Sequence, residues 1–122
     1  MQDSKERMKQ LAYEFANCRS AFTAMGDENR QLIMIQLMCH FGGMRVNDIA
    51  QETHLSRPAV SHHLKILKEA GIVEMYAVGT KHFYHMSGDE KSWKRFTDLL
   101  RHVENLMNEM SEEERRCGKY DE

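Results

Sequence analysis

Hydrophobic residues recur at alternating steps of three and four along most of the chain, which is the spacing of helices with one apolar face. The longest such runs cover about residues 4–25 and 89–110, and shorter ones cover about 28–40, 46–52 and 57–70. Between residues 72 and 87 the pattern changes to apolar and β-branched runs on either side of the letters VGTK, which predicts a hairpin. The chain is therefore predicted to be mainly α, with one small β-hairpin.

Local signals mark where these helices begin and end. Asp27 is a good N-cap for the second helix, and the sequence FGG at 41–43 is expected to stop it. Ser56 is a good N-cap for the helix that follows, Pro58 fits its first turn, and Gly71 suits its C-terminus. Five residues of the second helix are expected to be buried: Leu32, Ile33, Ile35, Leu37 and Met38.

The helix predicted at 57–70 has two chemically different faces. One arc is apolar and is expected to pack on the preceding helices; it holds Ala59, Val60, Leu64, Ile66, Leu67 and Ala70. The opposite arc is basic and polar, and it holds Arg57, Ser61, His62, Lys65, Lys68 and the acidic Glu69. His63 lies inside the apolar arc, so we expect an internal hydrogen bond there rather than a metal ligand.

Length and charge indicate how many domains the chain forms and where its positive charge lies. The 122 residues predict one domain, with net charge −2. Residues 53–86 are nevertheless locally positive, with 4 basic and 2 acidic side chains and five of the seven histidines.

The three cysteines, Cys18, Cys39 and Cys117, are widely spaced, which favours a reducing compartment. No apolar run approaches the roughly 20 residues of a membrane span, and the charged start is unlike a signal peptide, so a cytoplasmic protein without membrane contact is expected.

The predicted order places a helix-turn-helix at 46–70 directly before a two-stranded wing at 72–87. In such a motif the polar face of the second helix is shaped to enter the major groove of DNA. The run "SRPAVSHHLKILKEAGIV" and the following "GTKHFYHM" resemble the ArsR/SmtB family of bacterial winged-helix repressors, as does "MGDENRQLIMIQLM" before them. This resemblance covers about residues 20–88.

The resemblance implies a homodimer that binds double-stranded operator DNA, through an interface built by the segments 1–25 and 89–111. Two copies of the second helix predict an imperfectly palindromic operator. Arg57 is expected to pair with guanine, Lys65 and Lys68 to meet phosphates, and the wing tip to reach the backbone or minor groove. The predicted DNA-binding residues are Ser56, Arg57, Ser61, His62, Lys65, Lys68, Thr80, Lys81 and His82. The predicted dimer-interface residues are Leu11, Phe15, Trp93, Phe96, Leu100, Val103 and Met107.

Many members of that family release DNA when they sense a metal or an oxidant, and here the effector stays open. No CxC sequence is present, and Asp98 with His102 alone gives too few ligands for tetrahedral zinc, so no metal and no cofactor is expected. A redox alternative pairs Cys39 with Cys117, against the simpler hypothesis that Cys18 and Cys39 are small buried hydrophobes.

Catalysis has little support, because no phosphate loop, nucleophile triad or carboxylate pair is recognisable. The competing hypothesis is a winged helix that binds another protein instead of an operator, which the acidic total charge mildly favours.

Overall fold

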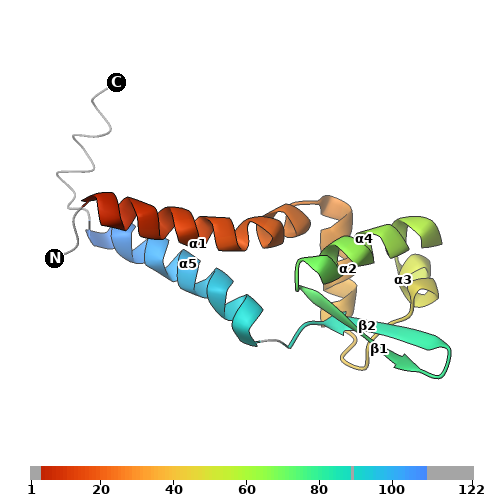
Figure 1. The fold of residues 1–122 in the computed structure, drawn as a ribbon. Coiled ribbons are helices and arrows are strands. Elements are labelled where there is room, and N and C mark those ends of the chain that lie inside the picture. The colour runs from red at the N-terminus through yellow and green to blue at the C-terminus, as the bar shows by residue number, and fades with distance from the viewer. Residues whose placement is uncertain (1–3, 89, 110–122) are drawn as a thin grey trace.

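The computed structural model describes residues 4–88 and 90–109, which form five helices and one antiparallel hairpin (Figure 1). In chain order the elements are α1 (Ser4–Met25), α2 (Glu28–Met38), α3 (Val46–Glu52), α4 (Arg57–Glu69), β1 (Val73–Val78), β2 (Lys81–Met86) and α5 (Glu90–Glu109). The mainly helical fold with a small hairpin that the sequence predicted is confirmed. No helix within the described ranges has the length and apolar character needed to cross a membrane.

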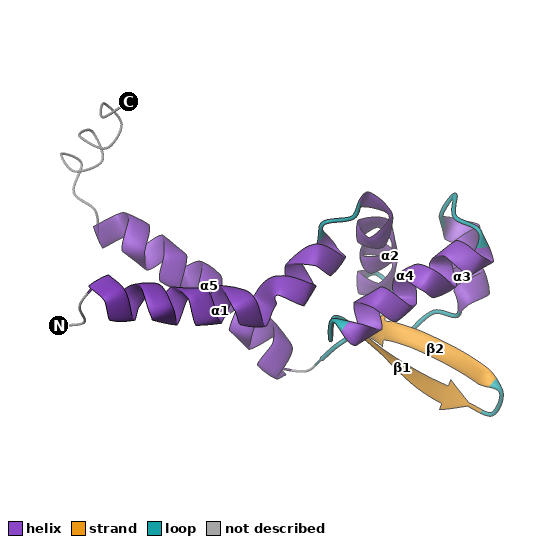
Figure 2. Cartoon of the chain, turned by 45° about the horizontal axis from the view of Figure 1, so that its top comes forward, coloured by secondary structure: helices purple, strands orange, loops and turns teal. Residues whose placement is uncertain are grey.

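The molecule has two parts. Helices α1 and α5, far apart in sequence, lie side by side as a long pair, while α2, α3, α4 and the hairpin form a separate head (Figures 1 and 2). Phe22 of α1 contacts Phe96 of α5, with ring centroids 4.8 Å apart. The start of α4 and the tip of the hairpin lie at the end of the head that is farthest from the free ends of the α1–α5 pair (Figure 1).

The hydrophobic core lies in the head. It is formed where one face of α4 meets α2, α3, β1 and the end of α1, and the side chains that are almost completely buried there include Ile33, Leu37, Ile49, Val60, Leu64, Leu67 and Val73. The core therefore holds α4 by its apolar arc, as the sequence predicted.

The ends of α4 have the predicted signals. The Ser56 side chain accepts a hydrogen bond from the backbone N–H of Ala59 at 3.2 Å, and Pro58 lies in the first turn. At the other end Gly71 has φ of 78°, a left-handed conformation that side chains disfavour. The N–H groups of Gly71 and Ile72 donate to the carbonyls of Lys68 and Leu67, each at 3.0 Å, which is a Schellman motif.

The second helix differs from its prediction in two respects. Asp27 caps it as expected, accepting from the N–H of Arg30 at 3.0 Å, but the helix ends at Met38 rather than at about His40. The prediction that Ile35 and Met38 are buried is wrong, because both are exposed. The rest of the head packs on the side of α2 that carries Ile33, Met34 and Leu37, so the opposite side of α2 remains in solvent.

The glycines after α2 join it to the sheet. Gly43 has φ of 88°, and a Cβ there would lie 3.1 Å from the carbonyl oxygen of Tyr84. This close approach lets Met44 exchange two backbone hydrogen bonds with Tyr84, at 2.9 and 2.8 Å. The FGG sequence therefore forms the turn that places Met44 beside the hairpin. It does not itself end α2, which stops earlier, at Met38.

The hairpin has the predicted turn. β1 and β2 pair from Val73 with Met86 to Val78 with Lys81, which leaves Gly79 and Thr80 as the two turn residues. Only Gly79 of these two has positive φ, 63°, as in a type II′ turn. The tip thus projects Thr80, Lys81 and His82 at the end of the wing.

Candidate nucleic-acid interface

The polar face of α4 is held outward by its apolar face. Val60, Leu64 and Leu67 are buried in the core, and these three positions fix how the helix is rotated about its axis. Because the opposite side faces solvent, five predicted DNA contacts on α4 are all exposed: Arg57, Ser61, His62, Lys65 and Lys68. Ser56, the exposed N-cap residue, lies at the start of this row.

The start of α4 is joined to α3 by a polar contact. Arg57 Nη1 donates to Asn47 Oδ1 at 3.2 Å, and both residues are on the surface of the head. Asn47 lies in the first turn of α3, on the side that adjoins the start of α4. This contact limits the positions of the Arg57 guanidinium while leaving its other donors free for DNA. Asn47 was not predicted as a site residue.

The wing tip extends the same surface. Thr80, Lys81 and His82 are exposed, and the tip lies at the same end of the head as the start of α4 (Figure 1). The two elements therefore place basic and hydroxyl groups on one end of the molecule. All nine predicted DNA-binding residues are exposed there or along the polar face of α4.

His63 is more buried than its neighbour His62, although the centroids of the two rings lie 5.8 Å apart. The His63 side chain is 14% exposed, and its Nδ1 lies 3.3 Å from Arg30 Nη1 and 4.0 Å from Asp27 Oδ2. Since arginine is always a donor, Nδ1 must be the unprotonated acceptor in this bond. Burial lowers the pKa of the His63 imidazole, and the nearby charges of Arg30 and His62 lower it further against the opposing effect of Asp27.

Arg30 was also missed by the sequence interpretation, and it connects three elements. Its Nε donates to the carbonyl of Ala24 at 2.7 Å, and its Nη2 donates to the carbonyl of Thr23 at 3.3 Å. Arg30 thus links the C-terminal end of α1 and the first turn of α2 to His63 on α4. The sequence around Arg30 does not indicate this role, because its partners are backbone carbonyls of α1 and a side chain of α4, which only the fold brings near.

The α1–α5 pair carries the predicted dimer residues, and several are exposed in the single chain. Phe15 is 47% exposed, and Leu100 and Met107 are each 49% exposed. Leu11 and Val103 are half-buried. Trp93 and Phe96 are half-buried by contacts within the chain: Trp93 packs against the core and donates from Nε1 to the carbonyl of Ser87 at 2.9 Å, and Phe96 contacts Phe22.

The possible metal ligands on α5 have other partners. Asp98 accepts from Lys94 Nζ at 2.9 Å, and His102 Nδ1 lies 2.9 Å from a carboxylate oxygen of Glu14. Within residues 4–88 and 90–109, no three His, Cys, Asp or Glu side chains are grouped so that they could hold a metal ion.

The cysteines divide between two environments. Cys18 is buried, whereas Cys39 is exposed, so the hypothesis that both are small buried hydrophobes is wrong for Cys39. Cys39 directly follows Met38, the last residue of α2, which is exposed as well. Cys117 lies outside the described residues, and the pairing of Cys39 with Cys117 stays a prediction.

Comparison with known proteins connects this geometry with a family. Residues 27–75, from the cap of α2 into β1, match the model of the bacterial regulatory proteins of the arsR family. An HTH-type transcriptional regulator of Methanocaldococcus jannaschii, MJ1325, is 34% identical over 93 residues, which cover 76% of this chain and 98% of that protein. The chain belongs to the arsR family.

Two further relatives extend this assignment. The transcriptional repressor SdpR of Bacillus subtilis is 34% identical over 68 residues, covering 56% of this arsR-family chain and 73% of SdpR. The crystal structure of the ArsR-family transcriptional regulator RHA00566 has a TM-score of 0.66 over 79% of this chain and 95% of that one, at 16% identity, which shows the shared fold. As a member of the arsR family with this winged-helix fold, the protein is a DNA-binding transcriptional regulator.

Proposed function

We propose that the protein is a homodimeric repressor that inserts α4 of each subunit into the major groove of an imperfectly palindromic operator. The observation that supports this most strongly is the orientation of α4: its basic face is exposed along its whole length, while its apolar face is buried. Arg57 and Ser61 lie toward the N-terminal end, where a recognition helix contacts base edges, and Lys65 and Lys68 lie farther along.

The wing completes the proposed footprint. Thr80, Lys81 and His82 extend from the same end of the head and would contact the backbone or minor groove next to the α4 site. The protein acts on DNA in the cytoplasm and needs no catalytic step, since its relatives are transcriptional regulators.

The dimer is proposed to form through the α1–α5 pair. Phe15 and Phe22 of α1 stand two helical turns apart, as do Leu100 and Met107 of α5, and all four are more than one-third exposed. Two apolar rows on adjacent helices form a surface that monomeric proteins rarely leave in water. A second copy of the same pair covers it symmetrically.

The DNA-binding experiment begins with selection of an operator from a random-sequence duplex library by the purified protein. We expect enrichment of a palindrome whose half-sites are centred about one helical turn, roughly 34–36 Å, apart. Affinity for that sequence should fall steeply as salt rises, because bound lysines and arginines displace counterions from phosphates. No enrichment, or binding to a protein partner unaffected by any DNA, would favour the protein-interaction hypothesis.

The dimer is tested by the double substitution of Leu100 and Met107 with aspartate. Because both side chains are exposed in the single chain, the variant should fold, and sedimentation should show a monomer. The matched control, Arg101→Asp with Glu104→Arg, alters two other exposed positions of the same helix and should leave the dimer intact. A dimer that persists in the Leu100 and Met107 variant contradicts the proposed interface.

A further inference from the structure

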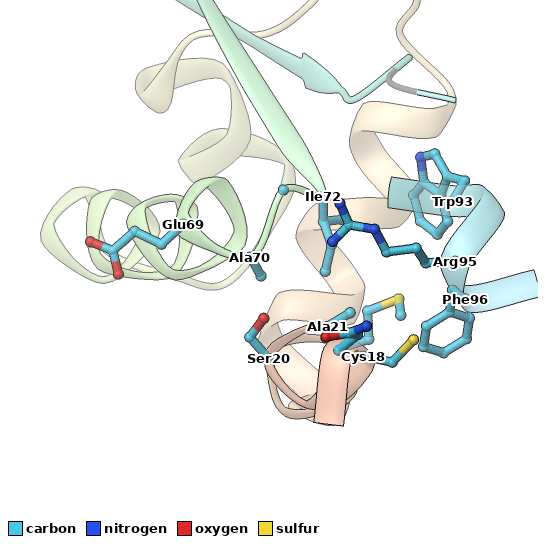
Figure 3. Close-up of a pocket in the computed structure, with 12 residues that line it drawn as sticks. Cys18, Ser20, Ala21, Glu69, Ala70, Ile72, Trp93, Arg95 and Phe96 are labelled. Atoms are coloured by element: carbon cyan, nitrogen blue, oxygen red, sulfur yellow. The ribbon is translucent and has the colours of Figure 1, made fainter. Parts of the chain in front are cut away.

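A cavity of about 220 Å³ lies between the α1–α5 pair and the end of the recognition helix (Figure 3). Cys18 and Ala21 approach it from α1, Ala70 and Ile72 from the junction of α4 and β1, and Phe96 from α5. The cavity plays no part in the proposed DNA contacts. It lies between the α1–α5 pair and the head, the two parts of the molecule that a regulator has to couple.

The walls combine apolar and polar surface in similar amounts. Met25, Ile72, Trp93 and Phe96 provide the apolar and aromatic part. Asn17, Ser20 and Arg95 provide hydrogen-bonding groups. Small-molecule sites combine apolar and aromatic walls with a few polar groups that fix the orientation of the ligand, and this hollow offers both kinds of group.

Among the described residues that line the cavity, Arg95 is the one basic side chain, and the carboxylate of Glu69, the one acidic group, points away from the hollow (Figure 3). The Arg95 side chain extends from α5 across the hollow toward Ile72 (Figure 3). Among the side chains of residues 4–88 and 93–109, no carboxylate lies within ion-pair distance of its guanidinium. An acid of the neighbouring hollow, Glu14, is already bonded to His102 and to Gln10. The guanidinium is therefore available for an anion, and its planar fork fits a carboxylate.

Cys18 forms part of the wall. It is 3% exposed, and burial raises the pKa of its thiol, against the lowering effect of Arg95. A neutral buried thiol is a poor nucleophile and a poor target for oxidants. The cavity thus favours reversible binding over covalent sensing.

The volume limits the size of the ligand. A dry apolar cavity of roughly 150 Å³ accepts benzene. The somewhat larger space here suits one aromatic ring with a carboxylate attached. We propose that this cavity binds a small monocyclic aromatic carboxylate, with the acid on Arg95 and the ring against Trp93 and Phe96.

The position of the cavity suggests a regulatory role, and this part rests on the proposed function. Glu69, Ala70 and Gly71 line one side and form the C-terminal end of α4, while Trp93 and Phe96 come from the predicted dimerisation helix. A ligand that bridges them changes the orientation of α4 relative to the α1–α5 pair. Binding of the ligand and of the operator are then coupled, and the coupling is reciprocal.

The test uses the full chain and benzoate, with neutral benzamide as the matched ligand that lacks the charge. In amide NMR titrations without DNA, benzoate should shift the resonances of Cys18, Ile72 and Phe96, and benzamide should bind at least about tenfold more weakly. Arg95→Met should weaken benzoate binding by a similar factor, whereas Arg101→Met, on the same helix but outside the cavity, should not. Ala21→Leu, which fills the hollow and keeps Arg95, should also abolish binding.

Each result decides one claim. Absence of benzoate shifts in the wild type, or equal binding in the folded Arg95→Met and Ala21→Leu variants, overturns the site. If the site binds benzoate, saturation with it should change operator affinity about 5- to 150-fold. Unchanged operator affinity overturns the regulatory role only. Failure of the wild type to bind any operator refutes the proposed function and leaves the ligand site standing.

Discussion

The head and the α1–α5 pair have the same hydrophobic period but use it differently. In the head, the centre of the apolar row of α4 is covered by the chain itself: Val60, Leu64 and Leu67 are each at most 1% exposed. On α5, Leu99 is covered in the same way, but its neighbour Leu100 is 49% exposed. A helical period therefore identifies an apolar face, but it does not tell whether that face is covered by its own chain or by a second one.

The polar faces of α4 and α5 differ in whether their charged side chains have partners within the chain. On α4, Lys65 and Lys68 of the polar row have no ion-pair partner among the residues that the structure describes. On α5 the polar side chains pair with each other or with α1, as Lys94 does with Asp98 and His102 does with Glu14. Unpaired positive charge therefore distinguishes the surface proposed for DNA from an ordinary solvated helix face.

The largest expected effect comes from truncating a leucine in each region. Leu64→Ala should lower the free energy of unfolding by about 2–5 kcal/mol, because it removes a fully buried side chain and leaves a cavity. Leu100→Ala should cost less, and its cost should depend on protein concentration, because in the proposed dimer the side chain that it truncates packs against a second chain. Urea unfolding at several protein concentrations separates the two effects.

That comparison fails if the two variants have equal stability at every concentration. Such a result would mean that Leu100 is buried by its own chain in solution. The interface proposed for α1 and α5 would then be without its main support.

A smaller effect is expected at the start of α4. Arg57→Ala should weaken operator binding by about 1–3 kcal/mol and relax the preference at one base pair in each half-site, if the guanidinium pairs with guanine. Asn47→Ala should have a smaller effect in the same direction, because it removes only the group that positions Arg57. Gel-shift titrations against the selected operator and single-base variants measure both. An Arg57→Ala protein with unchanged affinity and specificity would contradict a base contact.

Much of the fold follows from the sequence because its signals are local. The bounds of α1, α3 and the hairpin, the caps at Asp27 and Ser56, and the glycine end of α4 depend on residues within one or two turns. The end of α2 and the exposure of Ile35 and Met38 depend instead on which side the head covers, and this is decided by distant segments.

The candidate site divides in the same way. The exposure of the five predicted residues on α4 could be predicted, because the apolar arc of the helix determines the opposite arc. The exposure of Ser56, Thr80, Lys81 and His82 could be predicted because they lie at a helix cap and at a hairpin turn. The Arg57–Asn47 contact and the connection of Arg30 to α1 and His63 could not, because their partners come from other helices or from backbone carbonyls. The cavity beside Arg95 was also not predicted, since three separate elements form its walls.

A modest pH effect should separate His63 from His62. The pKa of His63 is lowered from 6.5, mainly by burial, so the unfolded chain binds a proton more readily than the native one. Its contribution to stability is therefore complete above about pH 6.5 and is lost as the pH falls through that value toward the folded pKa. Asp27, whose pKa is lowered from 3.8 by the N–H of Arg30, loses its own contribution only in more acidic solution.

Unfolding experiments between about pH 5 and 7.5 should show this difference. In His63→Asn, an amide oxygen can still accept from Arg30 but does not titrate, so the decline toward low pH should be reduced. His62→Asn, at an exposed neighbouring position, should keep most of the decline, because the charge of His62 is the smallest of the causes that shift the pKa of His63. Identical profiles for the wild type and both variants would show that His63 is not buried against Arg30 in solution.

The most direct test of the central claim compares a lysine on each region. Operator affinity is measured over a range of salt concentrations for the wild type, Lys65→Ala on α4 and Lys9→Ala on α1, both at exposed positions. If the outward face of α4 contacts phosphates, Lys65→Ala should flatten the slope of log affinity against log salt by about 0.9 for each phosphate that the removed lysine neutralised, and Lys9→Ala should leave it unchanged. Equal slopes for all three proteins, or a flatter slope only in Lys9→Ala, would contradict the assignment of DNA binding to α4.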